Sequence, residues 1–343
     1  GAEFNFETMR MELTSFSALL FNPVAQVKFV HTVAAGYVTG AVFVLAISSW
    51  YLLKGRDLGF ARRSFAIASA FGMASILSVI ILGDESGYEI GDVQKTKLAA
   101  IEAEWHTEPA PAAFTLFGLP NQAEQRTDYA IKIPYVMGII ATRSLDTQVT
   151  GIKDLIKQHE VRIRNGMQAY ALLEKLRNGE KTPENLAAFD QHKQDLGYGL
   201  LLKKYTPAVV DASEAQIKQA ALDTIPNVAT VFWSFRLMVA SGFLMLGLFI
   251  CAFWASARKN EEKKRWLLKW ALLSLPLPWV AAQTGWIVAE HGRQPWSIAE
   301  VLPVHLSTST VSAADVWGSL LALLAFYSVL LVIEMYLMIK FAR

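Results

Sequence analysis

The stretch FVHTVAAGYVTGAVFVLAISSWYLL, residues 29–53, contains no Asp, Glu, Lys or Arg. About 20 consecutive apolar residues allow a helix to cross the hydrocarbon core of a bilayer, so this stretch predicts a membrane span. Four further stretches meet the same requirement, although Arg236 and Glu334 interrupt two of them. The predicted spans are 29–53, 64–83, 229–257, 270–289 and 316–339. We therefore expect an all-α fold, a polytopic bundle of five transmembrane helices.

The overall composition agrees with a membrane protein. Of the 343 residues, 53% are hydrophobic and 18% are charged, and the mean hydropathy is +0.30. The net charge of +2 is too small to indicate a nucleic-acid partner. The single cysteine, Cys251, lies in an apolar run, which excludes a disulfide framework or an iron–sulfur site built from this chain alone.

Positive charge is concentrated in the short connections on one side of the predicted bundle. The links 54–63 and 258–269 and the end of the chain all carry Lys and Arg. Because cytoplasmic loops are enriched in these residues, we assign these places to the cytoplasm. The outer side then holds segments 1–22, 84–225 and 290–315. Two spans lie in 23–83, two in 226–289 and the last in 316–343.

The outer segment 84–225 has the composition of a soluble helical protein. Apolar positions recur with helical spacing over 154–176, Thr182 and Pro183 mark a helix start, and Ser213 with Gln216 forms a capping box. Loops of this length usually bind something or act as lids.

The chain begins at Gly1, without an initiator Met or a signal peptide. We expect further sequence upstream, and an amphipathic stretch over 9–21. Asn22 followed by Pro23 predicts an N-cap and a first-turn proline, so the first helix should begin before residue 29.

Two spans carry potential iron ligands at similar depths, namely His31 and Met238. A histidine paired with a thioether is a standard way to hold six-coordinate haem iron. One turn further on, Ala35 and Gly242 leave a bare patch of helix against which a flat macrocycle could lie. The alternative is ordinary: a hydrogen-bonding histidine, a methionine that fills the core, and close helix packing through small residues.

Two charged positions accompany them. Arg236 could pair with a haem propionate or with a carboxylate of a neighbouring helix. Glu290 closes the fourth span and precedes Gly292-Arg293-Gln294-Pro295-Trp296, which places a guanidinium and an aromatic beside it. A weak oxygen ligand would leave iron with an open position suited to oxygen chemistry. The alternative for Glu290 is a solvated interfacial charge.

These residues stand within motifs that match a known family. The chain resembles subunit I of the cytochrome bd-type quinol oxidases over essentially its whole length, beginning partway through that subunit. The motifs that carry the resemblance are VKFVHT (27–32), GDESGYE (83–89), GDVQKTK (91–97), RLM (236–238) and GRQPW (292–296).

The resemblance implies a ligand set and a substrate. His31 and Met238 would be the axial ligands of a low-spin haem b, and Glu290 would belong to a high-spin haem b paired with haem d or a third haem b. The segment 84–225 would be the long form of the quinol-binding loop, in which Lys97 and Glu102 are implicated in quinol oxidation. The family's first four spans, with a further histidine ligand, have no counterpart here, and the implied partners are subunit II and small accessory membrane subunits.

The implied reaction is oxidation of ubiquinol or menaquinol at the outer face of a bacterial inner membrane, with segment 84–225 periplasmic or extracellular. Glu102 would accept a proton, and Lys97 would either steer the quinol oxygens or hold the loop. Electrons would pass through aromatics such as Trp286, and oxygen would be reduced to water with cytoplasmic protons, so that charge is separated without a pump. Taken without the family, Lys97 and Glu102 could instead belong to a solvated helix face.

A different class stays open at this point. His31, Arg236, Glu290 and Glu334 could form a metal-free polar network in a transporter or scaffold.

Overall fold

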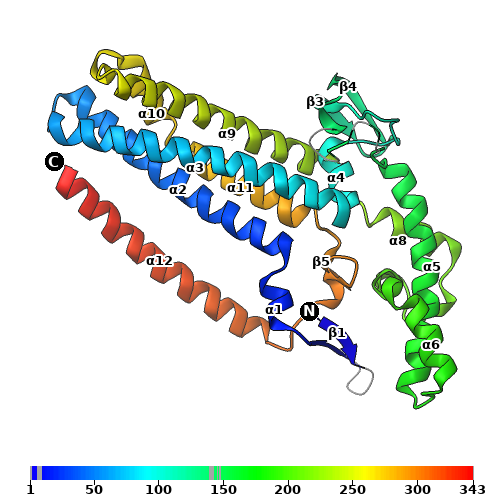
Figure 1. The fold of residues 1–343 in the computed structure, drawn as a ribbon. Helices are drawn as coiled ribbons and strands as arrows, with labels where there is room; N and C mark the ends of the chain where they lie inside the picture. The colour runs from blue at the N-terminus through cyan, green and yellow to red at the C-terminus, as the bar shows by residue number, and fades with distance from the viewer. Residues whose placement is uncertain (1, 6–9, 139–142, 145, 147, 343) are drawn as a thin grey trace. The chain divides into compact units, whose positions relative to one another are not determined.

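The computed structural model describes residues 2–5, 10–138, 143–144, 146 and 148–342. It confirms the predicted helical fold, with five segments that are long and apolar enough to span a membrane. Four of them belong to the first compact unit, Gly1–Pro303. Three of these four are single helices, and the fourth is divided into two helices. They are α2 (Pro23–Lys54), α3 (Leu58–Val93), α9 (Val228–Ala257), and α10 (Arg265–Leu273) together with α11 (Leu277–His291) (Figure 1).

The ends of these helices follow from local chemistry. The first helix begins at Pro23 as predicted, because the Asn22 side chain accepts a hydrogen bond from the Ala25 N–H at 3.1 Å. The fourth span differs from the single helix predicted over 270–289. It is broken between α10 and α11 because Pro276 and Pro278 lack the N–H groups that a continuous helix requires.

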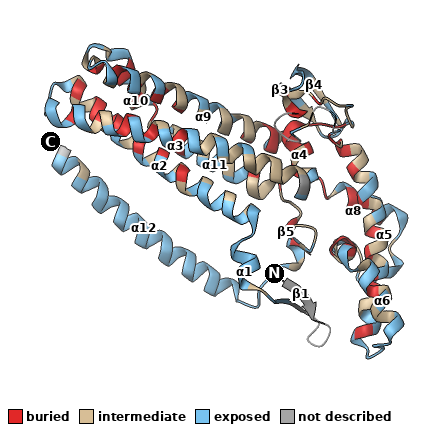
Figure 2. Ribbon diagram, in the orientation of Figure 1, coloured by how far each residue is buried: buried red, intermediate tan, exposed pale blue. Residues whose placement is uncertain are grey.

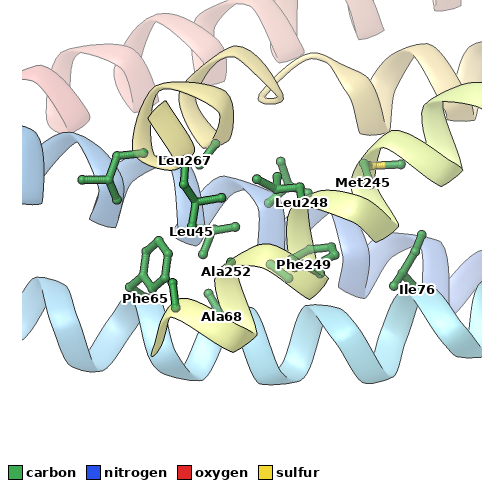
Figure 3. Close-up of a cluster of buried hydrophobic side chains, with 14 of the residues drawn as sticks. Leu45, Phe65, Ala68, Ile76, Met245, Leu248, Phe249, Ala252 and Leu267 are labelled. Atoms are coloured by element: carbon green, nitrogen blue, oxygen red, sulfur yellow. The ribbon is translucent and has the colours of Figure 1, made fainter. Parts of the chain in front are cut away.

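Helices α2, α3, α9 and α11 form a four-sided bundle. α2 packs on α3, α3 on α9, α9 on α11, and α11 returns to α2, while α10 fits against α2 and α9. The core near α10 contains Leu45, Phe65 and Phe249, all fully buried (Figures 2 and 3). A Cβ atom at Gly72 would lie 2.0 Å from the Phe249 ring, so only glycine lets this ring seat against α3. Cys251 is partly buried against the same core.

The helix α3 is longer than the predicted span 64–83, because it continues to Val93 through the Gly-Asp-Glu-Ser-Gly-Tyr-Glu motif at the start of the outer segment. The helices predicted from 154–176, from Thr182 and from the Ser213–Gln216 capping box are confirmed. The helices of the segment are α4 (Lys95–Glu102), α5 (Ile152–Arg177), α6 (Pro183–His192), α7 (Leu196–Leu200) and α8 (Glu214–Leu222).

The sequence did not predict an antiparallel hairpin between α4 and α5. Its strands are β3 (Phe114–Asn121) and β4 (Arg126–Ile133), and Thr115 pairs with Lys132 across them. The hairpin covers one side of α4, because the Trp105 indole N–H donates to the Thr127 hydroxyl at 3.0 Å and that hydroxyl donates to the Ala103 carbonyl at 2.9 Å.

An ion-pair network ties the helical part of the outer segment to the chain that follows α11. Arg162 on α5 contacts Asp195 at 2.6 Å and Glu300 at 2.8 Å. The Tyr198 hydroxyl donates to Glu300 at 3.1 Å, and the Tyr198 ring lies 5.1 Å from that of Trp296. We call Arg162, Asp195, Tyr198 and Glu300 the clasp.

The remaining elements of the first unit are short. The amphipathic stretch expected over 9–21 is a strand followed by a helix rather than one element, and Met9 lies outside the described residues. These elements are β1 (Ala2–Asn5), β2 (Arg10–Leu13), α1 (Phe16–Leu20), β5 (Trp296–Ile298) and β6 (Leu302–Pro303), with 3₁₀ turns at Lys193–Asp195, Leu201–Lys204, Val209–Asp211 and Glu261–Lys263.

The second compact unit, Val304–Arg343, holds the fifth span. After a 3₁₀ turn at Val304–Leu306, α12 (Ala313–Ala342) is apolar around its circumference and exposed along its length. A helix that is hydrophobic all round is typical of a membrane environment.

Candidate functional site

The short helix α4 places the two charged residues singled out in the outer segment, Lys97 and Glu102. Both are buried, with 3% of each residue exposed, which argues against a solvated helix face. Their side chains point to different partners: Lys97 reaches the end of α11, and Glu102 reaches α9. The helix α4 thus connects two of the four bundle helices at their outer ends.

Glu102 forms a buried ion pair with Arg236. The Arg236 Nη2 atom lies 3.2 Å from Glu102 Oε2, and the Thr115 N–H donates to the same carboxylate oxygen at 3.3 Å. Of the two partners proposed for Arg236, the structure provides the carboxylate, although it comes from α4 and not from a membrane helix. Burial raises the pKa of Glu102 to about 7, while the Arg236 charge and the Thr115 hydrogen bond act in the opposite direction. This carboxyl can therefore take up and release a proton near neutral pH.

Backbone carbonyls and an aromatic ring complete the surroundings of Arg236. Its Nη1 atom donates to the Ile101 carbonyl at 2.6 Å and to the Phe232 carbonyl at 3.2 Å, and Nη2 also donates to the Thr115 carbonyl. The guanidinium carbon lies 3.4 Å from the centroid of the Phe232 ring. Arg236 is therefore fixed in position by α4, β3 and its own helix.

Lys97 caps the carboxyl end of α11. Its Nζ atom donates to the Ala289 carbonyl at 3.0 Å, one of the terminal carbonyls that the helix itself leaves without a partner. The lysine stem crosses Gly292, where a Cβ atom would lie 3.1 Å from Lys97 Cγ and 2.5 Å from the Val288 carbonyl oxygen. The pKa of Lys97 is lowered to about 8, chiefly by burial and then by the charges of Lys28 and Arg293, while the charge of Glu290 raises it.

The end of α11 also brings Glu290 and Arg293 together. Arg293 forms an ion pair with Glu290, and the Gln294 side-chain amide donates to the Glu290 carbonyl at 3.4 Å. Both side chains of the pair are about one-third exposed, at 37% for Glu290 and 35% for Arg293. In contrast, Trp286 is 65% exposed and belongs to none of these contacts.

His31 and Met238 occupy α2 and α9, which lie on opposite sides of the four-sided bundle. His31 comes eight residues after the start of α2 and Met238 ten residues after the start of α9, so both lie about 12–15 Å from the outer helix ends. A Cβ atom at Gly83 would lie 3.4 Å from His31 Cε1, and one at Gly285 would lie 3.0 Å from Met238 Sδ. Each proposed ligand thus faces a glycine on the neighbouring helix.

The surroundings of these two side chains fit an axial ligand pair. The His31 Nδ1 atom is buried and lacks a hydrogen bond of good geometry among the described residues. Next to Met238 in the helix, Gly242 has open space where a Cβ atom would point, as expected for a bare patch. An imidazole and a thioether are the donor set for six-coordinate haem iron, and these residues could hold such a group.

The fold and this site define a helical membrane protein in which an imidazole and a thioether could hold haem and buried carboxyls lie beside the bundle. The family model of the cytochrome bd terminal oxidase subunit I matches residues 1–343. The chain belongs to this family.

Two curated relatives bear names from the same family, and one solved structure has a similar fold. The chain is 48% identical over 343 residues to cytochrome bd-II ubiquinol oxidase subunit 1 of Escherichia coli K12, covering 100% of this chain and 67% of that protein. It is 27% identical over 338 residues to cytochrome bd ubiquinol oxidase subunit 1 of Bacillus subtilis, covering 98% and 60%. The bd oxidase structure from Geobacillus thermodenitrificans has a TM-score of 0.67 at 23% identity, covering 99% of this chain and 62% of that one. The chain thus spans about two-thirds or less of these proteins.

Proposed function

We propose that this chain forms the quinol-oxidising and haem-bearing part of subunit I of a respiratory quinol oxidase. The observation that carries the proposal is the buried Glu102–Arg236 pair, which puts a carboxyl that titrates near neutral pH on the same bundle that bears His31 and Met238. The names of the relatives, which are ubiquinol oxidase subunits, support a quinol substrate. The substrate in this proposal is ubiquinol or menaquinol.

In this proposal, Glu102 accepts a proton from the quinol hydroxyl. A carboxyl whose pKa is about 7 is ionised in a large fraction of molecules at neutral pH and is still basic enough to take up the proton. Arg236 holds the carboxylate in place and stabilises its charged form. Lys97 holds the end of α11 beside it, which favours the second of the two roles predicted for this lysine.

His31 and Met238 are the proposed axial ligands of a low-spin haem b, which, when bound, would accept electrons one at a time. Glu290, held by Arg293, is the proposed residue of the high-spin haem site at which oxygen is reduced. Haem d or a third haem b, subunit II and any small accessory subunits complete the proposed enzyme. The proposed location is the bacterial inner membrane, with the outer segment on the periplasmic or extracellular side.

The test is Glu102→Gln in the full-length subunit with its partner. This change keeps the size and a hydrogen-bond acceptor for Arg236 but removes the proton acceptor. We expect quinol-driven oxygen uptake to fall about 100-fold, the usual loss for a general base, with unchanged haem spectra. The matched control is Glu124→Gln, since Glu124 is exposed and lies in the turn of the neighbouring hairpin. Normal quinol turnover in Glu102→Gln would refute the proposal.

A further inference from the structure

We propose that Glu104 and Glu108, with Lys132 between them, form the path by which the proton taken up by Glu102 reaches the outer surface. The inference rests on the proposed function and extends it to residues that no sequence motif indicated.

The three carboxylates become more exposed in order along the chain. The side chain of Glu102 is 4% exposed, that of Glu104 is 10% exposed and that of Glu108 is 28% exposed. The Lys132 Nζ atom lies 3.2 Å from Glu104 Oε2 and also donates to Glu108, and its charge acts on Glu102. One cation therefore contacts the outer two carboxylates and acts on the inner one through its charge alone.

The hairpin creates this arrangement. Thr115 on β3, whose N–H donates to Glu102, is the cross-strand partner of Lys132 on β4. Consequently the strand pair that fixes the inner carboxylate also carries the lysine for the outer two. Ala103 caps the end of α4 with a left-handed backbone, φ 49°, and the turn is fixed because the Glu104 N–H donates to the Ala99 carbonyl at 2.9 Å.

The charges of the network suit a single shared proton. Three carboxylates face two cations, Arg236 from α9 and Lys132 from β4, so the network is neutral when one carboxyl is protonated. Burial raises the pKa of Glu104 to about 7, Lys132 lowers it, and Glu108 and Glu102 raise it. Burial also raises the pKa of Glu102 to about 7, so both carboxyls are shifted in the same direction. The pKa of Lys132 is raised: burial lowers it, but the hydrogen bond with Glu108 and the charges of Glu104 and Glu108 outweigh burial.

The transfer is balanced in atoms and electrons. The quinol O–H bond breaks, a carboxyl O–H bond forms on Glu102, and the electron leaves for the haem that His31 and Met238 are proposed to hold. The proton then passes to Glu104, next to Glu108 and finally to water, while Glu102 returns to its ionised form. Lys132 stays protonated throughout and orients the two outer carboxylates.

Glu104→Gln in the full oxidase tests the path, with Glu124→Gln, in the exposed turn of the hairpin that carries Lys132, as the matched control. We expect quinol oxidation to slow at least tenfold, turnover with a donor that delivers electrons without protons to stay normal, and added formate to restore part of the quinol rate. Formate can carry a proton in place of a missing carboxylate, whereas it cannot repair a fold.

Each other outcome overturns the inference. Normal quinol oxidation in Glu104→Gln while Glu102→Gln is slow would overturn the path and leave the proposed function standing. Normal rates in both variants would overturn both. If turnover is slow both with quinol and with the donor that carries no protons, or if formate does not restore the quinol rate, Glu104 has a structural role. If Glu104→Gln does not assemble, Lys132→Met serves instead: loss of the cation should favour the protonated carboxyls and shift the pH optimum for quinol oxidation upward, and an unshifted optimum would refute the path.

Discussion

Lys97→Met removes the cap on α11 while keeping most of the apolar stem. In the unmutated protein the Lys97 Nζ atom donates to the Ala289 carbonyl at 3.0 Å. The variant leaves that carbonyl without its buried charged donor. A hydrogen bond to a charged group contributes about 1.5–3 kcal/mol, so the last turn of α11 should open more easily by that amount. Since each 1.4 kcal/mol corresponds to a factor of ten, we expect roughly 10- to 100-fold faster opening at this end of the helix.

Hydrogen exchange at the end of α11 measures this opening directly. The amides of Gly292 and Arg293 donate to the Val288 and Glu290 carbonyls. They should exchange roughly 10- to 100-fold faster in the variant. Gly292→Ala should also speed exchange while keeping the lysine charge, because its Cβ atom would lie 2.5 Å from the Val288 carbonyl oxygen and 3.1 Å from Lys97 Cγ and force the turn to move.

The control is Lys95→Met, because Lys95 is an exposed lysine on the same helix as Lys97 and should leave exchange unchanged. The reasoning is refuted if Lys97→Met raises the KM for quinol but leaves exchange of these amides within a factor of two. That result would mean that Lys97 acts on quinol directly, the first of its two predicted roles.

Three further predictions concern the haem sites and pH. His31→Ala or Met238→Leu should remove the low-spin haem signal from the visible spectrum; a six-coordinate spectrum in either variant contradicts the ligand assignment. Glu290→Ala should leave that haem reducible by quinol but abolish oxygen uptake, and unchanged carbon monoxide difference spectra with normal uptake would contradict the role of Glu290. The pKa of Glu104 is raised from the ordinary 4.5 to about 7, so the folded state binds this proton more tightly than the unfolded state. Its stabilising effect, roughly 3 kcal/mol, is complete below pH 4.5 and is lost as the pH rises to 7. Thermal unfolding of Glu104→Gln should therefore depend less on pH across this range, and an equally steep dependence would contradict the shifted pKa.

The membrane helices could be predicted because span length and hydropathy are local properties of the chain. The break between α10 and α11 was also readable, since Pro276 and Pro278 stand in the middle of the predicted fourth span. The hairpin β3–β4 was not predicted, although β3 contains aromatic and β-branched residues. A strand depends on its partner, and the proline-rich stretch before it favoured an irregular loop.

For the candidate site too, some features could be predicted from the sequence and others depend on the folded chain. The types and depths of His31 and Met238 predict a ligand pair from the sequence alone, and that assignment stays a prediction. The partner of Arg236 stayed open, because Glu102 is 134 residues away and only the folded chain brings them together. Glu104 carried no signal beyond its place in a charged stretch, since its burial comes from the hairpin. Lys97 looked like a surface charge because Gly292, which makes room for it, lies far along the chain.

The clasp changes what a break in the outer segment would do. The exposed turn between α5 and α6, around Gly179, is open to proteases. Arg162 lies before this turn, whereas Asp195 and Glu300 lie after it, and their ion pairs cross the cut. If the chain were cut here, both pieces would stay bound to each other. They would migrate together on a native gel and separate only after denaturation. An intact-looking complex on a native gel is thus no proof of an unbroken chain in this protein, and a denaturing gel is needed before a loss of quinol oxidation is ascribed to any single side chain.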